Sequence, residues 1–248
     1  MSAAAIRVRD LTVAYDRHPA IHHLSGEFKP GSLTALVGPN GGGKSTLLKT
    51  IVGLLRPAEG GIELSGVRPQ DIAYLPQQAE IDRSFPITVL DAVEIGHWRR
   101  VGIFRGIGRN LTKRALEALQ GVGLGGFEQR PIGTLSAGQF QRALFARMML
   151  QDAPLILLDE PFTAIDTRTT QDLLELVLRW HGENRTIVAV LHDLDQVRAH
   201  FPECVMVARE CVGWGRTPEI VTPANLLRAR QVSEAWDDHA DLCLRETA

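Results

Sequence analysis

Hydrophobic residues recur at two different periods along the chain, and the change of period divides it into parts. Apolar residues alternate with polar ones in two short runs between residues 6 and 15, which predicts a strand. Three other runs are apolar throughout, which is typical of parallel strands buried on both faces. These runs are residues 33–37, 155–158 and 186–191. Shorter strands are predicted at residues 24–28, 61–64 and 72–75.

Helical spacing dominates the middle of the chain. Residues 89–95 and 111–119 have apolar positions three and four apart, and Ser136 is a good N-cap for a helix that extends to Leu150. Residues 169–180, between the last two apolar runs, also have helical periodicity. Two buried strands joined by a helix favour an α/β fold with a parallel sheet. We therefore predict one domain whose α/β core (about 1–82 and 151–235) is interrupted by a helical insertion (about 83–150), with a short tail at 236–248.

Composition excludes several classes of protein. The chain has 248 residues, of which 44% are apolar and 23% charged, as in ordinary globular proteins. A formal net charge of −2 gives no basic field of the kind that nucleic-acid-binding proteins carry, so we expect no nucleic-acid partner. No run reaches about 18 uninterrupted apolar residues, so no membrane span is predicted. The three cysteines have no metal-like spacing, which favours reduced thiols in a cytoplasmic protein.

The most informative segment is a glycine-rich loop between an apolar run and a helical pattern. Its sequence fits G-x-x-x-x-G-K-[ST], in which backbone N–H groups surround phosphates at a helix N-terminus. The lysine reaches the β- and γ-phosphates, and the following hydroxyl can ligate Mg²⁺. We therefore predict that a nucleoside triphosphate binds here. The residues expected to contact it are Gly38, Pro39, Asn40, Gly41, Gly42, Gly43, Lys44, Ser45 and Thr46.

Two acids end the second apolar run. In nucleotide hydrolases with this kind of loop, an acid at such a strand tip holds Mg²⁺, which is the role predicted for Asp159. Glu160 is then expected to polarise the attacking water. No Asn-Lys-x-Asp segment occurs, which disfavours a GTPase, and the remaining pattern disfavours a small-molecule kinase.

Residues 135–139, Leu-Ser-Ala-Gly-Gln, followed by Gln141 and Arg142, resemble the signature of the ATP-binding-cassette (ABC) ATPases. Further family elements follow the family's order. They are an adenine-stacking aromatic (Tyr15), a Q-loop glutamine (Gln77), a D-loop (residues 163–166, ending at Asp166) and a switch histidine (His192). The resemblance covers residues 6–230. It implies a RecA-like P-loop core with an antiparallel β subdomain and an inserted helical subdomain.

The resemblance also implies how the protein works. Two chains pair head to tail and enclose two ATP molecules, each between one chain's P-loop and the other chain's Ser136, Gly138 and Gln139. Glu160, His192 and Gln77 are the expected catalytic residues. The expected ligands of the magnesium ion are Ser45, Gln77 and Asp159. The chain departs from the family pattern at Ala137, where glycine is usual, and at Thr163, where serine is usual.

Several residues admit other interpretations. His18, His22 and His23 invite a metal site, but no other ligands have suitable spacing, so a solvated turn is the prediction. The acidic tail, residues 237–243, also contains metal-ligand side chains, and a frayed terminus is expected there. The basic residues between 99 and 109 are predicted to form a solvated face.

The predicted function is the ATP-hydrolysing subunit of an importer. With no span of its own, the chain would act on the cytoplasmic face of the membrane through a separate permease. Residues 82–93 are similar to the corresponding segment of bacterial zinc, manganese and iron importers, with a docking groove predicted over Phe85 and Val89. Zinc is the favoured substrate and manganese the next, delivered by an extracytoplasmic binding protein. The alternative is a non-transport ABC ATPase of repair, translation or cofactor assembly, although no second cassette, coiled coil or basic face is seen. A third alternative, an ATP-dependent interaction module without turnover, is opposed by Glu160 and His192.

Overall fold

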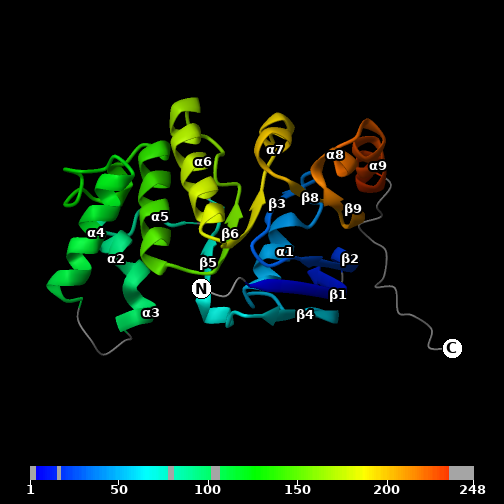
Figure 1. Ribbon diagram of the computed structural model, residues 1–248, viewed down its shortest axis with the longest axis horizontal. Helices are drawn as coiled ribbons and strands as arrows, with labels where there is room; N and C mark the ends of the chain where they lie inside the picture. Colours follow the sequence, from blue (N-terminus) through cyan, green and yellow to red (C-terminus); the bar gives the residue numbers. More distant parts are fainter. Residues whose placement is uncertain (1–3, 16–17, 78–80, 102–106, 235–248) are drawn as a thin grey trace.

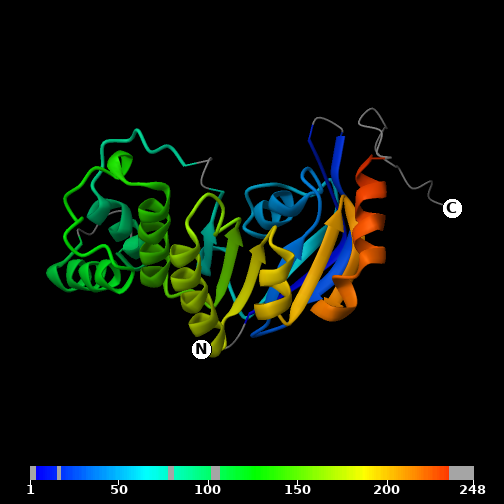
Figure 2. The ribbon, with the colours of Figure 1, turned by 90° about the horizontal axis from the view of Figure 1, so that it is seen from above.

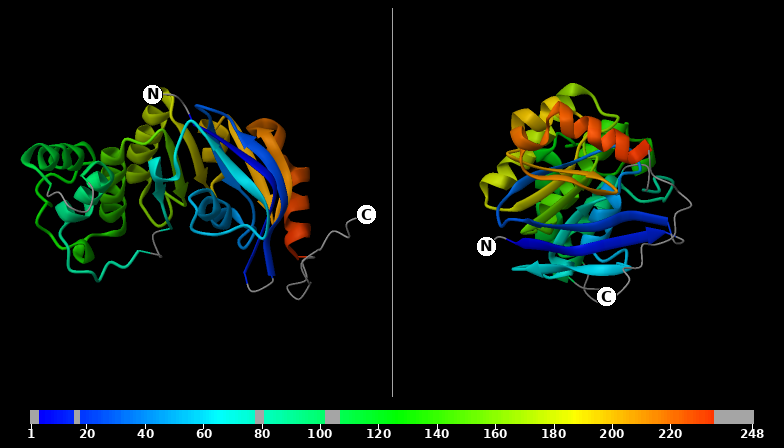
Figure 3. Two further views of the ribbon diagram at one scale, coloured as in Figure 1. Left: turned by 90° about the horizontal axis from the view of Figure 1, so that it is seen from below. Right: turned by 90° about the vertical axis from the view of Figure 1, so that its right-hand side faces the viewer.

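The computed structural model describes residues 4–15, 18–77, 81–101 and 107–234 (Figure 1). Two sheets and a group of helices make up this part of the chain. The helical group lies at one end and the C-terminal helix α9 (Pro223–Glu234) at the other, as Figures 2 and 3 show. The larger sheet lies between them.

The smaller sheet has three antiparallel strands in the order β2 (His18–Phe28), β1 (Ala5–Tyr15) and β4 (Glu59–Ser65). Its inward-facing side chains are fully or almost fully buried. They include Ile6, Val8, Leu11, Val13, Ile21, Leu24 and Phe28. This sheet is the antiparallel β subdomain that the family resemblance implies.

The larger sheet has six strands in the order β5 (Ile72–Leu75), β6 (Leu155–Asp159), β7 (Thr186–Val190), β3 (Leu33–Val37), β8 (Glu203–Ala208) and β9 (Glu210–Arg216). All neighbouring pairs are parallel except β8 with β9. The parallel strands share one carboxyl edge, where ligands bind in open α/β sheets. Both β3 and β6 end at this edge: the glycine-rich loop follows β3, and Asp159 ends β6 with Glu160 directly after it.

Helices cover both faces of the large sheet. Helix α1 (Lys44–Ile51) lies between the two sheets, where Leu47 and Leu48 pack in the same core as Leu36 of β3. On the opposite face, α6 (Thr167–Gly182) and α7 (Leu194–His200) contribute to a second core that contains Leu33 of β3. Alternate side chains of one strand thus face two cores, which requires the continuous apolar run seen in the sequence.

The helical region lies between β5 and β6 in the chain. It contains α2 (Val89–Glu94), η3 (Ile95–His97), α3 (Trp98–Val101), α4 (Arg109–Gly121), η4 (Ile132–Thr134) and α5 (Ala137–Gln151). The expected helical insertion is therefore present. Two short elements complete the description, η1 (Pro69–Asp71) and α8 (Thr217–Ile220).

Two expectations about local structure are wrong. His18, His22 and His23 lie on β2 rather than in a turn, because β2 begins at residue 18, six residues before the predicted start at residue 24. Val89 is fully buried as the first residue of α2, so it cannot form the floor of an open groove; Phe85 is 61% exposed. The acidic tail at 237–243 lies outside the described residues, as do residues 102–106 of the basic stretch between 99 and 109.

Candidate functional site

The glycine-rich loop wraps tightly against the edge of the large sheet. Gly43 is the N-cap of α1 and has a φ of 93°, in the left-handed region that favours glycine. A Cβ added to Gly43 would lie 2.4 Å from the carbonyl oxygen of Ala20. A Cβ added to Gly42 would lie 2.8 Å from the carbonyl oxygen of Val207. Larger residues are therefore excluded from a loop whose N–H groups open a helix, and such a loop is a ready-made phosphate site.

Lys44 lies folded back into this loop. Its Nζ donates to the carbonyl oxygens of Gly38 (3.0 Å) and Pro39 (2.8 Å), and the residue is 6% exposed. Burial lowers the pKa of Lys44, while the nearby charges of Glu160 and Asp159 act in the opposite direction. A buried ammonium with only carbonyl partners in the loop is well suited to exchange them for phosphate oxygens.

Ser45 and Asp159 meet across the start of α1 and the end of β6. The Ser45 hydroxyl donates to Asp159 Oδ1 at 2.9 Å, and Asp159 is 1% exposed. A hydroxyl and a carboxylate are the hard oxygen donors that Mg²⁺ prefers. These two residues fit a magnesium ion that also contacts phosphates in the loop.

Glu160 is the centre of the most connected polar cluster at this edge. Its Oε2 accepts from Gln77 Nε2 (3.0 Å) and from the Thr163 hydroxyl (3.3 Å), and its Oε1 lies 2.9 Å from His192 Nε2. Its backbone has a φ of 52°, uncommon for a residue with a side chain, and such strain is often found at functional sites. Burial raises the pKa of Glu160, but the bonds and charge of His192 and the bonds from Gln77 and Thr163 together lower it below its ordinary value. The carboxylate is thus kept ionised, as a base must be.

A cavity of about 490 Å³ opens beside this cluster. Gln77, Glu160 and Thr163 line it from the core side, and Arg83 lines it from the segment that leads into the helical region. This cavity gives water access to the Glu160 carboxylate.

Tyr15 lies beside the loop at the end of β1. It is 46% exposed, and its hydroxyl is 3.4 Å from the Thr46 hydroxyl. An exposed ring next to a phosphate-binding loop offers a stacking surface for a base. The structure therefore places Tyr15, Asp159, Glu160, Gln77 and His192 around the glycine-rich loop.

The signature residues are not part of this cluster. Ser136 caps α5 by accepting from Gln139 N (3.2 Å), and Gln139 Oε1 accepts from Ser136 N (3.0 Å), which is a complete capping box. Asp166 caps α6 in a similar way through Thr169. Helix α5 lies in the helical region and α1 lies between the sheets (Figure 1).

One residue at the site, Arg83, makes contacts that the sequence did not predict. Arg83, in the segment after Gln77, donates to the carbonyl oxygen of Leu135, and its guanidinium lies 4.7 Å from the centre of the Phe140 ring. It attaches the segment after Gln77 directly to the start of α5. A single arginine in a loop carries no sequence pattern that would have indicated this contact.

Comparison with known proteins agrees with this geometry. The family model described as ABC transporter matches residues 21–163. The manganese transport system ATP-binding protein MntB of Listeria monocytogenes is 37% identical over 88% of this chain and 92% of its own. The zinc transport system ATP-binding protein TroB of Treponema pallidum is 37% identical over 92% of this chain and 87% of its own.

Solved structures of ABC transporter proteins have the same fold as this chain. An ABC transporter in an inward-facing conformation, described as of the metal-chelate type, matches with a TM-score of 0.81 and 29% identity, over 93% of this chain and 90% of its own. A dimeric ATP-binding cassette bound to ADP and phosphate matches with a TM-score of 0.76 and 25% identity, over 86% of this chain and 98% of its own. None of the helices within the described residues is both long and apolar enough to cross a membrane.

Proposed function

The chain belongs to the ABC transporter family, and we propose that it is the ATP-hydrolysing subunit of an importer for a transition-metal ion, zinc or manganese. The observation that carries the proposal is the intact hydrolytic cluster around Glu160 in a chain whose relatives along nearly its whole length energise metal transport. A module that binds ATP without turnover would not need an ionised carboxylate held by three donors. A non-transport ATPase is disfavoured because relatives named for manganese or zinc transport match about 90% of the chain.

The proposed roles follow from the contacts. Lys44 and the loop N–H groups hold the β- and γ-phosphates. Ser45 and Asp159, with Gln77, hold Mg²⁺, which when bound neutralises charge on the phosphates. Glu160 orients and deprotonates the attacking water, and His192 holds the Glu160 carboxylate and reaches the γ-phosphate. Tyr15 stacks on the adenine.

The separation of α5 from the loop supports a dimer. Ser136 and Gly138 lie at a helix N-terminus that is suited to an anion, yet their own chain's loop lies elsewhere in the fold. In a head-to-tail pair, each α5 N-terminus would complete the partner's ATP site, together with Gln139 and Asp166. ATP would then hold the dimer together, and hydrolysis would release it.

The permease is proposed to dock on the helical region beside Gln77. Phe85, Ile95 and Trp98 are 61%, 41% and 56% exposed, although all three are large and apolar. All three lie within residues 85–98 of the sequence. Exposed large apolar residues of this kind are typical of a surface that binds a protein partner. The chain would thus be attached to the membrane through its permease. A metal-binding protein outside the membrane would deliver the substrate.

Metal uptake by cells tests the substrate. Cells that lack this subunit should take up less radioactive zinc or manganese under chelation, and the wild-type chain should restore uptake. The Glu160→Gln chain should not restore it, because it lacks turnover, whereas Arg179→Ala, a surface change outside the site, should.

Growth of the deleted strain under chelation, with zinc or manganese added back, then distinguishes the two ions. Growth restored by added zinc more readily than by manganese would support the zinc prediction made from the sequence. Restoration by manganese alone would replace zinc with manganese and leave the mechanism unchanged. Normal uptake of both ions in the deleted strain, in the absence of a second importer, would contradict metal import.

A further inference from the structure

Two side chains that follow the signature segment connect α5 to the residue after Glu160 and to α6. Gln141 is 3% exposed, and its Nε2 donates to the carbonyl oxygen of Pro161 at 2.7 Å. Pro161 is the residue after Glu160. Helix α5 is therefore bonded directly to the backbone that positions the catalytic carboxylate.

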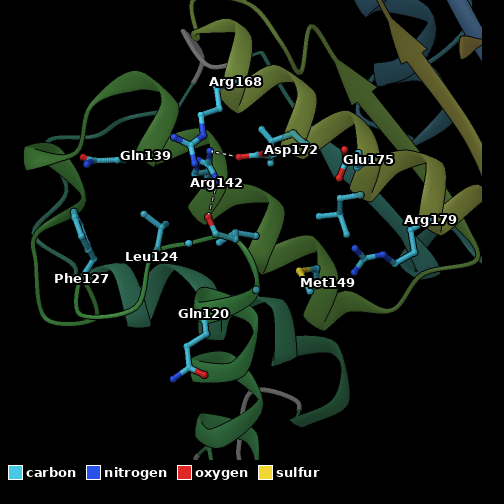
Figure 4. A pocket seen from close by; sticks show the side chains of 15 residues that line it. Gln120, Leu124, Phe127, Gln139, Arg142, Met149, Arg168, Asp172, Glu175 and Arg179 are labelled. Carbon is cyan, nitrogen blue, oxygen red and sulfur yellow. Dashed lines mark hydrogen bonds and ion pairs between the residues drawn. The ribbon is translucent and has the colours of Figure 1, made fainter. Parts of the chain in front are cut away.

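Arg142 makes the second connection, with three acceptors on two sides. Its Nη1 donates to the carbonyl oxygen of Val122 (2.9 Å), just after α4. Its Nη2 donates to Thr169 Oγ1 (3.2 Å) and Asp172 Oδ2 (2.6 Å), both on α6. Figure 4 shows the ion pair with Asp172. Its side chain is 18% exposed and that of Asp172 is 47% exposed. The rigid guanidinium fork fixes direction as well as distance, so this contact defines how α5 lies against α6.

The same contact reaches the D-loop. Thr169 donates from its backbone N (2.9 Å) and its hydroxyl (2.7 Å) to the Asp166 carboxylate. A Cβ added to Gly138 would lie 3.5 Å from Asp166 Oδ2 and from Thr169 Oγ1. The signature glycine and the D-loop aspartate therefore pack against each other within one chain, beside the Arg142 contact.

Hydrogen bonds and the backbone of the D-loop together connect Glu160 with the signature helix α5. The path begins at Glu160, which accepts from Thr163 at the start of the D-loop, and follows the D-loop backbone to Asp166. From there hydrogen bonds lead through Thr169 to Arg142, in the second turn of α5. In the proposed dimer, Glu160 and the N-terminus of α5 serve different ATP molecules.

We infer that Arg142 is a positioning residue that fixes the signature helix relative to Glu160 and so couples the two ATP sites of the dimer. The inference rests on the proposed function, because it requires composite sites. Arg142 touches no phosphate; it acts through the orientation of α5 and α6. Its loss should leave ATP binding to one chain's loop unchanged and should impair the steps that need both chains.

A charge exchange tests the inference. Arg142→Asp and Asp172→Arg should each lower kcat for ATP hydrolysis about tenfold or more, because small misplacements of reacting groups have effects of this size. The double variant should recover a large part of that loss, because the ion pair is restored in reverse. Arg179→Asp is the matched control. Like Arg142 and Asp172, it lines a cavity of about 700 Å³ between the helical region and α6 (Figure 4). Within the described residues its guanidinium makes no hydrogen bond.

Three further measurements separate positioning from folding. Affinity of the monomer for a fluorescent ATP analogue should stay within about twofold of wild type, ATP-dependent dimers in the Glu160→Gln background should weaken, and cooperativity in ATP should fall. Asp172→Asn gives the same test without a new charge, on a half-exposed residue whose change leaves the core intact.

The outcomes are distinguishable. Wild-type kcat and dimerisation in Arg142→Asp and in Asp172→Asn would overturn the inference. So would a loss that is confined to thermal stability, with unchanged kcat per folded chain. Absence of ATP hydrolysis in the wild-type chain itself would contradict the proposed function instead.

Discussion

His192 Nε2 lies 2.9 Å from Glu160 Oε1, although the two residues are 32 positions apart in the sequence. The pairing of neighbouring strands accounts for this distance. β6 and β7 are parallel, with Asp159 opposite Val190, so the segments that follow the two strands leave the sheet at the same edge. Glu160 follows β6 at once, and His192 follows β7 after one further residue. The geometry of the sheet therefore places the proposed base, Glu160, beside the imidazole of His192.

The first prediction follows from this pair. Glu160→Gln keeps the size of the side chain but removes the base, so hydrolysis should slow by about 10²-fold or more while ATP binding persists. ATP-dependent dimers should accumulate, because the step that separates them is blocked. Phosphate release and gel filtration with ATP measure the two effects. A variant that stays monomeric and hydrolyses ATP at the wild-type rate would assign the catalytic role to another carboxylate.

The second prediction concerns sharing of sites between chains. Lys44→Ala destroys the phosphate loop of one chain, and Ser136→Arg blocks the signature of the other. Each should be inactive alone. Mixed in equal amounts, they should recover part of the wild-type ATPase rate, because a mixed dimer pairs one intact loop with one intact signature. Native mass spectrometry of the mixture provides the control for dimer formation, and mixed dimers without any activity would argue against composite sites.

The candidate site residues could be picked out from the sequence because they lie at the ends of strongly patterned elements. The glycine-rich loop follows an apolar strand. The spacing of its glycines and lysine is the one that a phosphate-binding backbone requires. Ser136 was predicted as an N-cap and is one, with the helix ending one residue beyond the predicted Leu150. In each case local chemistry and tertiary structure require the same residue type.

The pattern was weaker where strands bulge or contain glycine. Asp10 and His23 both have positive φ, and the register of β1 with β2 shifts between Val8 and Leu11 and again between Leu11 and Val13, which breaks the alternation expected of a strand. The β9 strand contains two glycines, and the last helices are short or weakly amphipathic. The sequence pattern therefore predicts no helices or strands in residues 194–234. The Arg142 contacts were also missed, because they join segments that only the fold brings together.

The third prediction concerns the backbone of the phosphate loop. Gly43→Ala should abolish detectable ATP binding and lower the free energy of unfolding by roughly 1–3 kcal/mol, because φ is 93° and the new methyl would meet the carbonyl oxygen of Ala20. Gly53→Ala is the matched control. Gly53 has a φ of 80°, but nothing lies within 4 Å of an added Cβ, so this change should cost about 1 kcal/mol and leave ATP binding intact. Equal ATP affinity in the two variants would show that the close approach does not matter.

The fourth prediction concerns pH. Burial raises the pKa of Glu160, but the contacts of His192 and the bonds from Gln77 and Thr163 outweigh it and lower the pKa overall. This contribution to stability is fully present above the ordinary glutamate pKa and is lost as the pH falls through the lower, folded value. Thr163→Val removes one donor, so the pKa of Glu160 should rise. The acid limb of kcat/KM, which reports on the free enzyme, should then move to higher pH. Thr163→Ser keeps the hydroxyl and should leave the limb in place. A limb that is unchanged in Thr163→Val, or that moves to lower pH, would show that this bond does not tune the catalytic carboxylate.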